Sequence, residues 1–202
     1  MCNCDPGGRY TAAELREMLG SVGENVAINR SVIFYAPRRI HIGSNVRIDG
    51  YGILSAGSRN DGPPRIVIGD HVYIAPQVLL LGDSADIRID SFSTITAGTV
   101  VYTCTDDYTG GAIGNPTVPF CYRNARTGDV VLERHALVGA RSIIMPGVTL
   151  GLGSAVGALS FVNCNVPEFA VVAGAPARVI KQRDRRLLDL ERQFLQEAAQ
   201  PA

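Results

Sequence analysis

Residues 132–166 read LERHALVGARSIIMPGVTLGLGSAVGALSFVNCNV, and an aliphatic residue returns at every sixth position of this stretch. These positions are Leu132, Val138, Ile144, Leu150, Val156 and Val162. Four residues after each of them stands a small or β-branched residue, namely Ala136, Ser142, Val148, Ser154, Ser160 and Val166. A period of six matches neither an α-helix nor a long strand. It indicates short strands joined by tight turns, with the aliphatic side chain pointing inward and the small residue at the corner.

The same period occurs upstream of this stretch, with its phase shifted between blocks. The blocks contain Ile42 and Ile48, then Ile68, Ile74 and Leu80, then Ile89 and Ile95. The phase shifts indicate loops that leave the repeat. An ordinary β-sandwich would need turn signals every ~8–12 residues and offers no reason for a period of six. Stacked coils bury one continuous core, so the sequence predicts an all-β solenoid.

Composition agrees with a narrow solenoid and excludes several functional classes. The 202 residues include 22 glycines but only 6% aromatic residues, and 19 basic side chains balance 19 acidic ones. A nucleic-acid partner is not expected, because such proteins carry a basic face that neutralises phosphates. The sequence contains no run of ~18 apolar residues, so membrane insertion is not expected. Its first residues lack the charged-then-apolar layout of a signal peptide. We therefore expect a cytoplasmic protein.

The five cysteines do not predict a disulfide framework or a metal site. They stand at positions 2, 4, 104, 121 and 164, an odd and irregular set for a chain in a reducing compartment. Cys2 and Cys4 form a Cys-x-Cys pair that could bind a metal, but no second pair of ligands lies near them in the sequence. We expect no metal cofactor.

The hexads over Leu137–Ala158, together with the segment Ala173–Lys181, resemble the left-handed parallel β-helix acyltransferases that carry hexapeptide repeats. Within them, the chain is most similar to the sugar O-acetyltransferases of the galactoside, maltose and polysaccharide-biosynthesis branch. The resemblance covers residues 26–181. It implies three hexads in each coil, a homotrimer, and acetyl-CoA bound in the groove between neighbouring subunits.

The expected organisation has one main domain with two terminal additions. Residues 1–25 form an extension whose short helix begins at the capping-box pattern Thr11–Glu14. Residues 26–180 form the β-helix domain, and an inserted loop over 104–129 interrupts its repeat. Residues 181–202 contain an amphipathic C-terminal helix.

The inserted loop is the candidate for acceptor contact, because a loop of this length in a compact domain is usually either functional or disordered. The alternative is a solvated loop without a role. The resemblance implies that it helps to form an acceptor pocket at the subunit boundary. Asp106 and Asp107 are candidate catalytic residues that could bind acceptor hydroxyls or an amino group. Members of the galactoside branch have a histidine at the start of this loop, but here Thr105 stands near that position. The general base is therefore a carboxylate, a histidine from elsewhere, or the acceptor's own amine.

Only three histidines are available for that role. His135 follows the loop and is the candidate base among them. His71 has the same hexad position in a turn, and His41 is expected to be structural. A metal site of the γ-carbonic anhydrase type would need three histidines, two of them spaced His-x4-His, and this spacing does not occur.

The resemblance also implies a set of contacts with acetyl-CoA in the last coils. The matching positions are Ala140, Ala158, Asn163, Cys164, Arg178 and Lys181. Arg178 and Lys181 are suited to the phosphates of CoA, because charged donors form strong hydrogen bonds. Relatives often have Thr-Lys where this chain has Asn163-Cys164, so only the backbone contacts carry over there. The two alanines can equally be small because coils stack tightly.

The predicted function is acetyl-CoA-dependent transfer to a sugar hydroxyl, in the synthesis of a surface polysaccharide or O-antigen. The missing loop histidine leaves a second hypothesis, N-acylation of a nucleotide-linked amino sugar, because an amine has less need of a strong base. A third hypothesis is a trimeric β-helix scaffold without catalysis.

Overall fold

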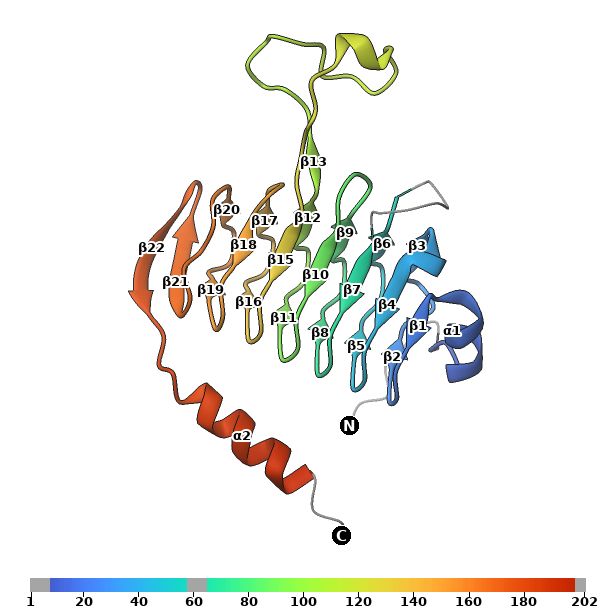
Figure 1. The fold of residues 1–202 in the computed structure, drawn as a ribbon, viewed down its shortest axis with the longest axis vertical. Helices are drawn as coiled ribbons and strands as arrows, with labels where there is room; N and C mark the ends of the chain where they lie inside the picture. Colours follow the sequence, from blue (N-terminus) through green and yellow to red (C-terminus); the bar gives the residue numbers. More distant parts are fainter. Residues whose placement is uncertain (1–7, 58–64, 199–202) are drawn as a thin grey trace.

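The computed structural model describes residues 8–57 and 65–198, and most of them form a solenoid of short parallel strands (Figure 1). Cys2 and Cys4 lie outside the described residues. Successive strands belong in turn to three sheets, so each coil has three faces. The predicted all-β solenoid is thus present.

Each face is a separate sheet running along the solenoid. The first face contains β1 (Ser21–Val22), β4 (Ile40–Ile42), β7 (Ile66–Ile68), β10 (Ile87–Ile89), β15 (Val130–Leu132) and β18 (Thr149–Leu150). The second contains β2 (Ala27–Ile28), β5 (Arg47–Ile48), β8 (Tyr73–Ile74), β11 (Thr94–Ile95), β16 (Leu137–Val138), β19 (Ala155–Val156), β21 (Ala170–Gly174) and β22 (Ala177–Gln182). The third contains β3 (Ile33–Tyr35), β6 (Ile53–Ser55), β9 (Leu79–Leu81), β12 (Val100–Tyr102), β17 (Ile143–Ile144) and β20 (Phe161–Val162).

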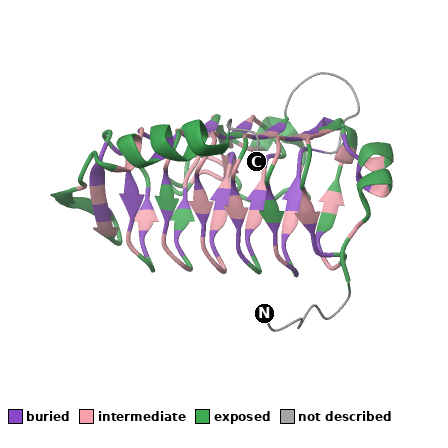
Figure 2. Cartoon of the chain, turned by 90° about the horizontal axis from the view of Figure 1, so that it is seen from below, coloured by how far each residue is buried: buried purple, intermediate pink, exposed green. Residues whose placement is uncertain are grey.

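The hexad residues form the core. All six aliphatic residues of the 132–166 stretch are buried, with exposed fractions of 3% or less. They stack on equivalent residues of the next coil: Leu132 pairs with Leu150 on the first face, and Val138 pairs with Val156 on the second. Burying one such side chain contributes about 1.5–3 kcal/mol, so the ladders hold the coils together. Figure 2 shows this buried core along the strands.

At the corners between faces, a small buried residue follows a residue that often has a positive φ. The small fifth-position residues are buried there, and the hydroxyls of Ser142 and Ser160 donate to the carbonyl oxygen of Gly157 at 3.0 and 2.7 Å. The residue before the small one often has a positive φ, as at His135 (63°) and Arg141 (57°). A residue with left-handed backbone conformation is needed to turn the chain so sharply. Large side chains at these positions point away from the core.

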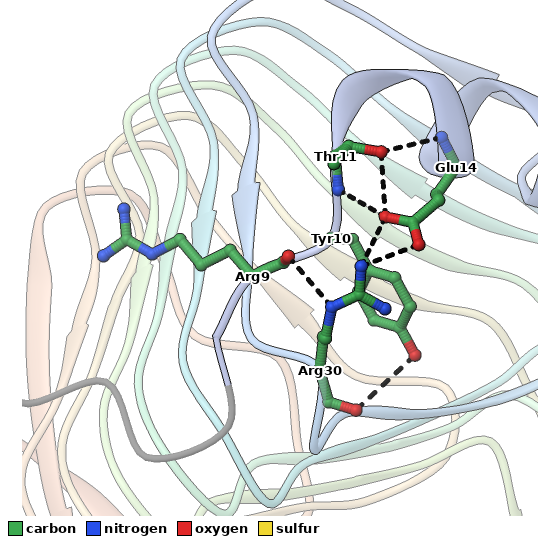
Figure 3. A network of polar contacts seen from close by, with 5 residues as sticks. All are labelled: Arg9, Tyr10, Thr11, Glu14 and Arg30. Carbon is green, nitrogen blue, oxygen red and sulfur yellow. Dashed lines mark hydrogen bonds and ion pairs between the residues drawn. The ribbon is translucent and has the colours of Figure 1, made fainter.

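The N-terminal end of the solenoid is covered by α1 (Ala12–Met18), which buries Leu15. Thr11 and Glu14 form the predicted capping box. The Glu14 carboxylate also accepts two hydrogen bonds from Arg30, at 2.6 and 2.7 Å (Figure 3). The first strand begins at Ser21, ahead of the predicted boundary at residue 26. A short 3-10 helix, η1 (Pro37–Arg39), follows β3.

The C-terminal end consists of the β21–β22 hairpin and a separate helix. Strand β22 runs to Gln182, so Lys181 lies on a strand and not at the start of the predicted helix. Helix α2 (Leu187–Ala198) then crosses the corner between the first and second faces, largely exposed (Figures 1 and 2).

Candidate active site

The inserted loop leaves the solenoid at the corner between the third and first faces. Its root is an antiparallel pair, β13 (Cys104–Thr105) with β14 (Arg126–Thr127), and its far part contains the 3-10 helix η2 (Phe120–Tyr122). Figure 1 shows it projecting well beyond the coils. The loop matches the predicted span of 104–129 and is anchored on a rigid wall, so its root can position side chains.

A cavity of about 590 Å³ lies where the loop meets the third face. We call it the loop-root pocket. It is lined by Tyr102, Cys104, Thr105, Asp106, Tyr108, Ile143, Met145 and Phe161. The wall from β12, β17 and β20 is mainly apolar, and the loop supplies the carboxylate. Ligand pockets usually combine an apolar lining with a few placed polar groups in this way.

Asp106 and Asp107 have different surroundings although they are adjacent. Asp106 lines the pocket, and its Oδ1 lies 3.7 Å from a guanidinium nitrogen of Arg123. Asp107 instead accepts hydrogen bonds from the backbone N–H and the hydroxyl of Thr109, at 2.8 and 2.7 Å. These bonds, first that from the hydroxyl, lower the pKa of Asp107 below its usual value. Asp106 is therefore the carboxylate available to a ligand, and Asp107 stabilises the loop turn.

His135 does not join the loop-root pocket within one chain. It lies at the corner between the first and second faces, under α2, where its Nε2 is 2.8 Å from the Glu191 carboxylate. Its ring stacks on Phe92 with centroids 5.2 Å apart, and its side chain is only 12% exposed. This placement gives His135 a structural setting and argues against its role as the general base.

The other two histidines also lie away from the loop-root pocket, and each contacts another side chain. His71 stacks on the other side of Phe92 at 4.8 Å, in the same corner as His135. His41 Nδ1 lies 3.0 Å from the Ser21 hydroxyl on the first face. Among the described residues, no group of three or more His, Cys, Asp or Glu side chains is arranged to hold a metal ion.

The predicted cofactor contacts divide between different parts of the coils. Ala140 and Ala158 lie on successive coils at the corner between the second and third faces, where the N–H of Leu159 donates to the carbonyl of Ala140. Arg178 pairs with Ala173 on the β21–β22 hairpin, and Lys181 lies further along β22. Both cations are exposed to solvent, as binding of phosphates requires.

Asn163 and Cys164 lie apart from the two alanines. They directly follow β20, so they stand at the corner between the third and first faces, from which the loop also leaves. Both side chains are exposed. In one chain, the Ala140–Ala158 corner and the loop-root pocket thus lie at opposite edges of the third face, whereas Asn163 and Cys164 lie at the same edge as the loop. The sequence stretch proposed for acceptor contact begins at Tyr102, which lines the pocket. Met145 and Phe161 in the pocket wall were missed, although their outward position follows from the hexad phase.

No family model matches the chain. An Escherichia coli dTDP-4-amino-4,6-dideoxy-D-glucose acyltransferase is 37% identical over 182 residues, which cover 90% of this chain and 92% of the relative. The structure of AntD, an N-acyltransferase from Bacillus cereus in complex with dTDP and 3-hydroxybutyryl-CoA, matches with a TM-score of 0.90 and 38% identity. The match covers 96% of this chain and 100% of AntD.

The chain belongs to the hexapeptide-repeat acyltransferases.

This acyltransferase also resembles the galactoside O-acetyltransferase of E. coli K12, at 28% identity over 85% of this chain and 68% of the relative. The predicted fold class, a left-handed parallel β-helix with an inserted loop and a C-terminal helix, is confirmed. The predicted enzyme class is confirmed as well. The E. coli relative is named for a dTDP-linked amino sugar, and AntD is an N-acyltransferase solved with dTDP. These names favour the N-acylation hypothesis over the sugar hydroxyl that we placed first. No helix among the described residues is long and apolar enough to cross a membrane.

Proposed function

We propose that this acyltransferase transfers an acetyl group from acetyl-CoA to the amino group of a nucleotide-linked amino sugar. The observation that carries the proposal is the lining of the loop-root pocket: among its residues one is a carboxylate, Asp106, and none is a histidine, beside three hydroxyls and the Cys104 thiol. A hydroxyl acceptor needs a base to remove its proton as it attacks, whereas an amine in its neutral form has a free lone pair. The Asp106 carboxylate suits an amine in a further way, because it attracts the ammonium form.

Relatives support the same assignment. The 37% identical E. coli protein is named as an acyltransferase of a dTDP-linked amino sugar. A variant of AntD has been solved with dTDP-4-amino-4,6-dideoxyglucose and coenzyme A. Such activated amino sugars are precursors suited to a surface polysaccharide, which is the role we propose here.

In the proposed reaction, Asp106 binds and orients the acceptor amine. The amine nitrogen forms a bond to the thioester carbonyl carbon as the carbon–sulfur bond breaks. Asp106 takes up the proton that the nitrogen loses and returns it to the leaving thiolate, so the products are an amide and free CoA. Arg123, 3.7 Å away, helps to keep the Asp106 side chain at the pocket. General acid–base assistance of this kind is typically worth ~10²–10⁴ in rate.

On the cofactor side, the exposed cations Arg178 and Lys181 fit the phosphates of CoA. The tight corner at Ala140 and Ala158 fits close backbone contact: a side chain at Gly139 would lie 2.4 Å from the Ala158 nitrogen. Acetyl-CoA would supply the activated acyl group.

We further propose a homotrimer with active sites between subunits. The third face carries an outward ladder of large apolar residues, which is unusual for a surface in contact with water. The ladder consists of Ile33, Ile53, Leu79, Val100, Ile143 and Phe161, paired in register from coil to coil. Burying it against neighbouring copies would bring the cofactor corner of one copy towards the loop-root pocket of the next.

The test is release of free CoA by the full-length protein. We expect turnover with acetyl-CoA and dTDP-4-amino-4,6-dideoxyglucose, and none with dTDP-glucose or a simple galactoside. Activity on the galactoside alone would favour O-acetylation. Absence of acetyl-CoA binding by calorimetry, in a protein that sediments as a trimer, would favour the scaffold hypothesis.

A further inference from the structure

The far part of the inserted loop folds back onto Asp106, the carboxylate that the proposed transfer step uses. Two stretches of the loop do so, residues 113–114 and residues 122–123. The N–H of Ile113 donates to the carbonyl oxygen of Tyr122 at 2.8 Å, which joins the two stretches. We call residues 113–114 and 122–123 together the loop brace. The brace links the distant part of the loop to the loop-root pocket.

The first contact of the loop brace with Asp106 is made by the backbone at Gly114. A Cβ at Gly114 would lie only 3.3 Å from Cβ of Asp106 and 3.7 Å from its Cγ. A glycine therefore lets the chain approach the Asp106 side chain closely. The backbone at this position closes one side of the carboxylate, so Asp106 cannot turn in that direction.

The second contact is electrostatic and comes from Arg123, directly after η2. A guanidinium nitrogen of Arg123 lies 3.7 Å from Oδ1 of Asp106, and the Arg123 side chain is 21% exposed. In the part of the chain that the structure describes, Asp106 is its only ion-pair partner, and its buried Nε has no hydrogen-bond partner. A largely buried cation without another partner is costly to separate from its carboxylate. Arg123 and Asp106 therefore hold each other in place.

Two other charged side chains lie near the root of the loop, and each is engaged elsewhere. Asp107 accepts the hydrogen bonds of Thr109. Arg126 is exposed on β14, and its charge acts on Asp107. Arg126 is thus a cation of the same loop that lies outside the pair formed by Arg123 and Asp106.

We infer that Arg123 is a positioning residue which, together with Gly114, holds the Asp106 carboxylate in the orientation that proton transfer requires. The inference rests on the proposed function, in which Asp106 takes up the proton of the acceptor amine. Such a transfer needs the carboxylate oxygen within about 2.6–3.2 Å of the nitrogen, so a rotated side chain would be out of reach. Arg123 touches no reacting atom and acts through Asp106. Its effect on turnover should therefore exist only while residue 106 is a carboxylate.

A double-mutant cycle in kcat tests this dependence, with release of CoA from acetyl-CoA and dTDP-4-amino-4,6-dideoxyglucose as the measurement. Arg123→Met should lower kcat roughly tenfold in the wild-type background, a part of what acid–base assistance contributes. In the Asp106→Asn background the same change should lower kcat by less than about twofold, because no carboxylate is left to hold. Similar falls in both backgrounds would show that Arg123 only maintains the shape of the loop and would overturn the inference.

Two further variants separate the position of the cation from the charge of the loop. Arg123→Lys keeps a cation beside Asp106, and since the native contact is an ion pair without a hydrogen bond, it should regain at least about half of the wild-type kcat. Arg126→Met removes the same charge from the same loop and is the matched control, with kcat expected within about twofold of the wild type. An equal loss of kcat in Arg126→Met and Arg123→Met would assign the effect to net charge and refute the positioning role.

Hydrogen exchange separates this inference from the proposed function, because it requires no turnover. In Arg123→Met the amide of Ile113 should exchange at least tenfold faster, since the brace loses its attachment to Asp106. The amide of Val131, which bonds to Val148 within the coils, should be unchanged. Unchanged Ile113 exchange, or unchanged kcat in Arg123→Met, would overturn the inference and leave N-acylation standing. Faster Ile113 exchange in a protein whose wild type releases no CoA would instead remove the proposed function and keep the brace on Asp106.

Discussion

The coils and the inserted loop of this acyltransferase differ in what fixes their structure. In the coils, each aliphatic residue packs on its counterpart one coil away. The six-residue period determines which side chains point into the core. In the loop, only the root pairs as strands, and Ile113, Phe120 and Tyr122 are half or more exposed. The coils therefore supply stability and a rigid wall, while the loop supplies the candidate chemistry. Substitutions in the two regions should separate loss of stability from loss of activity.

The largest expected effect is on stability, from shortening a core residue of the coils. Ile144 is fully buried on β17, so Ile144→Ala should lower the free energy of unfolding by about 2–5 kcal/mol. Ile113→Ala, in the loop, removes a side chain that is 50% exposed and should cost about 0.5 kcal/mol or less. Denaturant unfolding of both variants is the measurement. Equal losses would show that the loop contributes to the cooperative core.

The next effect is on activity, from the loop carboxylate. Asp106→Asn should lower kcat by roughly 10² or more, because its amide cannot take up the proton of the acceptor. The melting temperature should stay close to that of the wild type. Asp107→Asn is the adjacent control and should retain most of the turnover, since Asp107 lines no part of the pocket. A similar kcat in Asp106→Asn and the wild type would leave proton transfer to the amine itself.

A pair of glycines compares the same regions through backbone packing. A Cβ at Gly139 would lie 2.4 Å from the backbone nitrogen of Ala158, so Gly139→Ala should cost roughly 1–3 kcal/mol and disturb the cofactor corner. A Cβ at Gly111 would come no closer than 3.4 Å to the Asp107 side chain. Gly111→Ala should therefore be nearly neutral in thermal unfolding. Tolerance of Gly139→Ala would mean that the coils can separate at this corner.

His135 gives a smaller effect that tests where the base lies. Loss of its hydrogen bond to Glu191 in His135→Ala should loosen α2 at the cost of about 1–3 kcal/mol, with kcat little changed. Hydrogen exchange of α2 amides and CoA release measure the two consequences. A strong fall in kcat with α2 still protected would return His135 to the role that its place after the loop suggested.

The sequence was sufficient for the coils because one rule of spacing repeats in them. Residues 18 apart, such as Leu132 and Leu150, share a face, as the register confirms. The same counting puts Ala140 and Ala158 at one corner, and it could have placed Asn163 at another. The six-residue period could not predict the contacts of His135. These contacts are made with α2, whose side chains lie outside the repeat. Asp106 lines the pocket at the root of the loop, and its catalytic role stays a prediction. The Arg123 contact depends on how the loop folds back, which the sequence does not show.

The smallest expected effect concerns α1, which differs from the loop because it closes the open end of the coils. Hydrogen bonds from Arg30, and then from Thr11, lower the pKa of Glu14 from 4.5 to about 2 (Figure 3). A carboxyl group whose pKa is lower in the folded than in the unfolded state stabilises the fold at pH values above its unfolded-state pKa. That contribution is lost as the pH falls through its folded-state pKa. The melting temperature of Glu14→Gln should therefore lie below that of the wild type by a constant amount above pH ~5, and the gap should close towards pH ~2. The pair is exposed, so added salt should also narrow the gap. A gap that persists at low pH would mean that the carboxylate charge is not what holds α1 to the first coil.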